Sequence, residues 1–83
     1  MYEAANNYRV EMTDVGRRIR TLRESKGISI RQLAEFFNLT PQALYRWERG
    51  EVVPEVQNLV ALSRLFGVSV DALLVGDAYP IVA

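Results

Sequence analysis

Residues 38–50 read NLTPQALYRWERG, and this stretch predicts a sharp turn followed by a helix. Asn38 tolerates the left-handed backbone conformation that reverses a chain. Thr40 is a favourable N-cap residue, and Pro41 suits the first helical position, where no amide donor is required. The sequence therefore predicts a helix over residues 40–49.

The helix predicted over residues 40–49 has one apolar side. Leu44 and Trp47 are three residues apart and therefore share a face of the helix, which must be buried. Gly50 ends the helix as a C-cap residue. Gln42 and Arg46 are then expected to face away from the core.

A second predicted helix lies immediately before the turn. It opens at Ser29, where Gln32 three residues later completes a capping-box pattern, and it ends at Phe37. Two short helices joined by a three-residue turn are the core of a helix-turn-helix. In that arrangement the second helix projects from the body, and its N-terminal half can meet the edges of DNA bases.

Three further helices complete an all-α fold of five helices, in which helices two and three form the helix-turn-helix. Thr13 is the expected N-cap of the first helix, which Gly27 ends. A fourth helix is predicted over residues 55–66 and a short fifth helix over residues 70–74. We divide the chain into a loosely ordered arm (1–12), one domain (13–76) and a tail (77–83).

The composition excludes several classes of function. The 83 residues include no cysteine and no histidine, which most often build disulfides, zinc sites and neutral-pH acid-base catalysis. No uncharged run approaches the roughly 20 residues that span a bilayer. We therefore expect a soluble, cytoplasmic protein that is not an enzyme and has no cofactor, metal, small-molecule ligand or membrane partner.

The distribution of charge is more informative than its sum. The formal net charge is zero, yet residues 17–49 contain eight basic and three acidic residues, which gives this stretch a net charge of +5. Such a block can face phosphates, although a charge cluster alone is more often a solvated surface.

Residues 15–76 resemble the phage-repressor and Cro-type helix-turn-helix domain, the XRE family. The residues that carry the resemblance are Gly16-Arg17-Arg18-Ile19-Arg20, Leu22-Arg23, Lys26-Gly27, Ser29, Leu33-Ala34, Asn38-Leu39-Thr40, Trp47-Glu48-Arg49-Gly50, Pro54, Leu59-Val60-Ala61-Leu62, Leu65-Phe66-Gly67-Val68-Ser69 and Leu73-Leu74. The resemblance implies a lambda-repressor-like bundle that binds double-stranded DNA sequence-specifically, with helix 40–49 in the major groove.

The resemblance also implies residues that read bases. Gln42 occupies a position from which family members contact bases, and its amide can bond to adenine. Arg46, one turn further on the same face, can give two parallel bonds to guanine, and Ala43 can meet a thymine methyl group. The alternative is that the two polar residues are only solvated.

Six residues are implied in contacts to the DNA backbone, which fix register without reading sequence. They are Thr40, Tyr45, Arg49, Arg31, Arg17 and Arg18. For Tyr45, surface packing of the ring is an equal alternative.

Arg23 and Glu48 resemble the structural ion pair that joins helix three to helix one in the family.

Two positions depart from the pattern. Ile30 replaces a glutamine that clamps a phosphate in many members, and Pro41 stands where a polar base-reading residue often lies. Both departures put the affinity for DNA in doubt.

A single domain of this size buries little surface on one half-site, so we expect a homodimer. The candidate interface is the apolar stretch Val68–Val75 with Pro80-Ile81-Val82 of the tail.

The alternative to a DNA-binding regulator is a protein-interaction module on the same scaffold with little DNA affinity, which net neutrality, Ile30 and Pro41 all favour.

Overall fold

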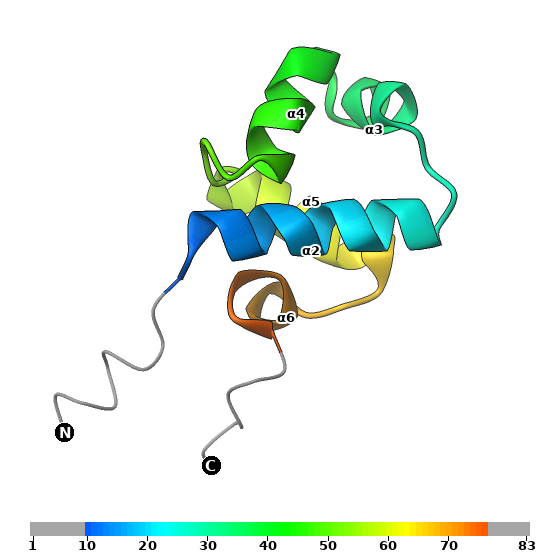
Figure 1. The fold of residues 1–83 in the computed structure, drawn as a ribbon. Coiled ribbons are helices and arrows are strands. Elements are labelled where there is room, and N and C mark those ends of the chain that lie inside the picture. The colour runs from blue at the N-terminus through cyan, green and yellow to red at the C-terminus, as the bar shows by residue number, and fades with distance from the viewer. Residues whose placement is uncertain (1–9, 77–83) are drawn as a thin grey trace, which may run out of the picture.

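The computed structural model describes residues 10–76, which form five α-helices and no strand (Figure 1). The helices are α2 (Met12–Ser25), α3 (Ile30–Phe37), α4 (Pro41–Glu48), α5 (Val56–Phe66) and α6 (Val70–Leu74). The predicted all-α fold is confirmed. Over the same range, none of the helices is both long and apolar enough to traverse a membrane.

The first helix begins earlier than the sequence predicted. Glu11, in an extended conformation, occupies the N-cap position, and its carbonyl oxygen accepts a hydrogen bond from the Val15 amide at 3.0 Å. Thr13 is therefore helical and not the N-cap, and Met12 belongs to α2 and not to the arm. The rest of the predicted arm (1–9) and the predicted tail (77–83), including the tail's part of the dimer interface, lie outside the described residues.

The turn before α4 has the geometry that its residues predicted. Asn38 adopts a left-handed conformation with φ of 55°. The Thr40 hydroxyl oxygen accepts a hydrogen bond from the Ala43 amide at 3.2 Å. The Ser29 and Gln32 capping box is complete, with both of its hydrogen bonds formed at the start of α3. Local caps therefore fix where α3 and α4 begin.

The core lies where the five helices of the described range converge. Its fully buried side chains come from all five helices and are Val15, Ile19, Leu33, Leu44, Leu62 and Leu73. Burying a side chain of this size contributes roughly 1.5–3 kcal/mol. Within the predicted dimer stretch Val68–Val75, Leu73 has no exposed surface and cannot contribute to an interface.

Helices α2 and α4 are in backbone contact. A Cβ atom on Gly16 of α2 would lie 2.5 Å from the carbonyl oxygen of Glu48, so only glycine fits at this crossing. Figure 1 shows α3 and α4 on one side of α2 and α6 on the other. The crossing thus places the helix-turn-helix on one side of α2.

Candidate nucleic-acid interface

Helix α4 has a buried side and an exposed side. Leu44 and Trp47 are buried in the core, whereas Gln42 and Arg46 are exposed and lie one turn apart on the same face. Ala43 is half-buried beside them. The three predicted base-reading residues therefore share one helix, and the side chains of the two polar ones are exposed on it.

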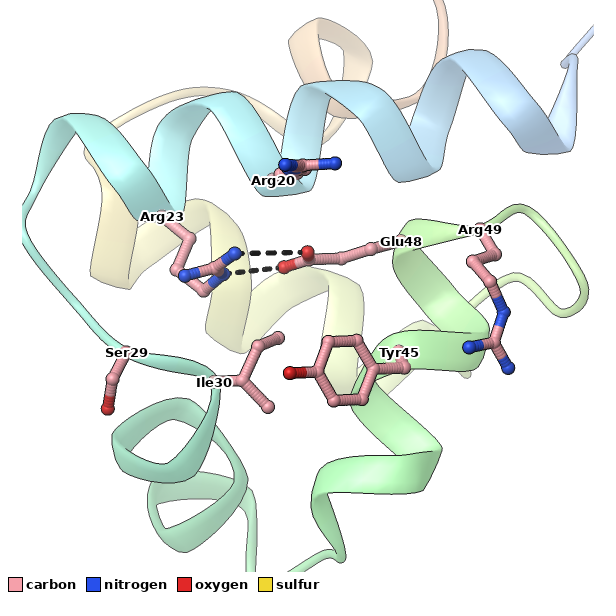
Figure 2. A pocket seen from close by; sticks show the side chains of 7 residues that line it. All are labelled: Arg20, Arg23, Ser29, Ile30, Tyr45, Glu48 and Arg49. Atoms are coloured by element: carbon pink, nitrogen blue, oxygen red, sulfur yellow. Dashed lines mark hydrogen bonds and ion pairs between the residues drawn. The ribbon is translucent and has the colours of Figure 1, made fainter.

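A nearly buried ion pair holds α4 against α2. Arg23 donates from Nε and Nη2 to the two carboxylate oxygens of Glu48 at 2.7 and 3.2 Å, and from Nη1 to the carbonyl oxygen of Ile28 at 2.9 Å (Figure 2). The Arg23 and Glu48 side chains are only 12% and 6% exposed. The hydrogen bond to Glu48 is the main cause that raises the pKa of Arg23. The predicted structural ion pair is confirmed.

A cleft of about 390 Å³ opens between α2, the start of α3 and α4. Figure 2 shows the Tyr45 ring reaching from α4 toward Ile30 on α3, with Arg20 of α2 above and Arg49 at the edge. Ile30 is half-buried and packs against the core. At the position where the resemblance implies a polar clamp, this chain has an apolar contact surface.

Three of the predicted phosphate-contacting residues are exposed around α4. Thr40 uses an oxygen lone pair to cap the helix, which leaves its hydroxyl hydrogen to donate. Arg31 is exposed in the first turn of α3, the helix that packs against α4. Arg49 is exposed directly after the last residue of α4. Arg31 thus lies on α3, and Thr40 and Arg49 lie at the two ends of α4.

Arg17 and Arg18 lie elsewhere. Both line a groove between α2 and α6. Arg18 donates from Nη1 to the carbonyl oxygens of Leu73 and Leu74 at 3.2 and 3.1 Å, so its guanidinium binds the end of α6. Arg17 pairs with Asp14 at 2.7 Å. Neither is brought together with the exposed face of α4, and neither enters the function proposed below.

Sequence reasoning missed Glu51. Its carboxylate binds Arg49 at 2.6 Å and Arg46 at 3.5 Å, through Nε of each arginine. The hydrogen bond from Arg49 is the main cause that lowers the pKa of Glu51, and the same bond raises the pKa of Arg49. The only signal in the sequence was an acidic residue two positions after Arg49.

The exposed face of α4, projecting beyond a three-residue turn, defines a helix-turn-helix protein, and comparison with known proteins agrees. A helix-turn-helix family model matches residues 19–73. The SPbeta prophage-derived uncharacterized HTH-type transcriptional regulator YonR of Bacillus subtilis (strain 168) is 39% identical over 61 residues, covering 74% of this chain and 56% of YonR. Repressor protein C2 of Salmonella phage P22 is 38% identical over 63 residues, covering 76% of this chain and 29% of C2.

A solved structure extends the likeness to three dimensions. The P22 c2 repressor, crystallised with synthetic operator 9T in the presence of Tl+, matches with a TM-score of 0.70 at 38% identity, over 76% of this chain and 96% of that one. This chain belongs to the helix-turn-helix family, and the predicted resemblance to phage repressors is confirmed. The chain spans about half the length of YonR and less than a third of C2.

Proposed function

We propose that this chain is a sequence-specific regulator of transcription that binds double-stranded DNA with α4 in the major groove. The observation that carries the proposal is the division of α4 into two sides. Gln42 and Arg46 are exposed together, while Leu44 and Trp47 anchor the helix in the core. A helix fixed from beneath, with two exposed planar polar groups one turn apart, has the chemistry needed to read base edges.

The base contacts follow from the chemistry of the three side chains. The Gln42 amide has one acceptor and one donor arm, which match N6 and N7 of adenine. The Arg46 guanidinium can donate two parallel bonds to O6 and N7 of guanine. Ala43 has a methyl group that can pack on the methyl group of thymine. A good bidentate contact discriminates between bases by roughly 1–3 kcal/mol.

The backbone contacts come from residues that flank this face. Arg49 and Arg31 supply positive charge, Thr40 supplies a hydroxyl hydrogen, and the exposed phenol of Tyr45 can donate to a phosphate. The N-terminus of α3 adds partial positive charge that favours contact with a phosphate of the DNA backbone. These contacts position α4 on the duplex and carry no sequence information.

The relatives support this proposal. The P22 repressor was solved with an operator, and YonR is named a transcriptional regulator. We assign the same kind of role here, without enzymatic activity and in the cytoplasm, where a regulator of the phage-repressor type finds its DNA. We further propose a homodimer that sets two copies of α4 about 34 Å apart on successive half-sites.

Selection of bound duplexes from a random DNA pool, at two salt concentrations, tests the proposal. We expect enrichment of a palindromic site, because two symmetric copies of α4 read two half-sites. A Gln42→Ala/Arg46→Ala variant should lose the enrichment, whereas Arg64→Ala, at an exposed arginine on α5, should keep it. Absence of enrichment at low salt would contradict the proposal and favour the protein-interaction module.

A further inference from the structure

The turn after α4 holds Glu51 in a fixed place. The Glu51 amide donates to the carbonyl oxygen of Arg46 at 2.9 Å, which closes the chain back onto the last turn of the helix. Gly50 adopts φ of 77°, and a Cβ atom there would collide with Thr13 of α2. The backbone of the turn is thus held from both sides, and the Glu51 side chain starts from a fixed point beside the end of α4.

The Glu51 carboxylate contacts each arginine at Nε, using Oε2 for Arg49 and Oε1 for Arg46. The closest approach is to Nε of Arg49 at 2.6 Å and to Nε of Arg46 at 3.5 Å. Nε lies on the side of the guanidinium, whereas the two terminal nitrogens form the end-on fork that bonds to guanine or phosphate. A carboxylate at Nε therefore orients the fork without occupying it.

Holding an arginine in this way has an energetic consequence. A free arginine side chain has many rotamers, and part of this rotamer entropy is lost when it binds a base. The hydrogen bond from Arg49 lowers the pKa of Glu51. The carboxylate is therefore ionised at neutral pH and remains paired with both arginines. An arginine whose side chain is already oriented loses less rotamer entropy on binding. The difference is larger where the guanidinium must meet a rigid pair of acceptors, such as O6 and N7 of guanine.

We propose that Glu51 is a positioning residue that orients the Arg46 fork toward the base it reads and so sets specificity at that position. The inference rests on the proposed function. Glu51 also repels phosphates, because it is negative and lies beside the interface. Glu51 thus has two separable effects. Its negative charge weakens binding to all DNA, whereas its contact with Arg46 orients the guanidinium and sharpens the choice of base.

Parallel selections with wild type, Glu51→Gln and Glu51→Asp separate the two effects. Glu51→Gln removes the charge, whereas Glu51→Asp keeps the charge but withdraws the carboxylate from Nε. We expect both variants to lower the preference at the base read by Arg46 by about fivefold, a part of what a bidentate contact gives. Only Glu51→Gln should tighten binding to non-operator DNA and steepen its salt slope, by about one unit.

Two controls make the outcome decisive. Glu55→Gln removes a nearby carboxylate that accepts a hydrogen bond from Gln57 instead, so it should leave the base preference unchanged. In an Arg46→Ala background, Glu51→Gln should no longer affect that base position. If wild type enriches a site and both Glu51 variants recover it with undiminished preference, the inference is overturned and the proposed function stands. If wild type enriches nothing, the proposed function fails and the inference with it.

Discussion

The ion pair between Arg23 and Glu48 gives the sharpest test of how α4 is held. It links α2 to the end of α4 by two hydrogen bonds, and Arg23 also binds the carbonyl oxygen of Ile28. We consider three variants: Arg23→Met, Glu48→Leu and the double substitution. Methionine and leucine remove the charge and keep much of the apolar volume.

The expected magnitude follows from the exposure of the two side chains. Exposed ion pairs contribute about 0–1 kcal/mol, whereas removing one partner of a buried pair costs about 3–5 kcal/mol because the other charge is left unpaired. With exposures of 12% and 6%, this pair is close to the buried limit. We expect each single variant to lose about 3 kcal/mol and the double variant about 1 kcal/mol, since two apolar groups leave no unpaired charge.

Urea denaturation followed by far-UV circular dichroism measures these losses, and the four proteins form a double-mutant cycle. Glu24→Gln, in the exposed pair of Arg20 and Glu24 at 3.4 Å, is the matched control and should change stability by less than about 0.5 kcal/mol. Single variants within about 1 kcal/mol of wild type, or a double variant less stable than either single, would refute the reasoning.

Other predictions concern the interface and the helix crossings. Arg46→Ala should reduce the preference at one base position, whereas Arg49→Ala should weaken binding to all sequences alike and reduce the salt slope by about one unit. Titration of base-substituted duplexes over a salt series measures both effects. Identical effects of the two substitutions would contradict the assignment of Arg46 to a base and Arg49 to the backbone. Gly16→Ala should lower the urea midpoint although alanine favours a helix by about 1 kcal/mol, because its Cβ would meet a carbonyl oxygen of α4. Thr21→Ala, at an exposed position of the same helix, is its control and should not lower it. Asn38→Val should cost at least about 1 kcal/mol, because a β-branched residue is strained at φ of 55°; thermal melting beside Asn38→Gly, which should be tolerated, checks this.

The order of the helices could be predicted because their ends are fixed locally. The capping box of Ser29 and Gln32, the Thr40 cap and the left-handed Asn38 each act within three or four residues of chain, and all are present. The spacing of Leu44 and Trp47 likewise identified the buried side of α4. The start of α2 was misplaced because Thr13 suits an N-cap, yet nothing in its chemistry prevents it from continuing a helix that begins one residue earlier.

The partners of the arginines could not be predicted in the same way. Arg18 and Arg17 look alike in sequence, but Arg18 binds carbonyl oxygens of α6 that are 55 and 56 residues away. That contact depends on how α6 packs across α2. The pair of Arg23 and Glu48 was predicted only through the family resemblance, because its 25-residue separation leaves no local periodicity to read.

Net neutrality weighed against DNA binding at the level of the sequence, and the structure shows how the positive charge is distributed. Of the basic block, Arg23 is neutralised by the nearly buried Glu48, whereas Arg17, Arg20 and Arg49 each pair with an exposed carboxylate. Arg49 binds Glu51 through Nε, which leaves its terminal nitrogens for a phosphate, and Arg31 is exposed, so these two are the charged phosphate contacts of the proposed interface.

Two charged contacts in each protomer make four in the proposed dimer. Because each neutralised phosphate contributes about 0.9 to the slope of log K against log salt, we expect a slope of about −4 on operator DNA. Fluorescence anisotropy at four or more salt concentrations measures it. A slope near −10 would contradict this assignment, because it would require other basic residues to reach the duplex.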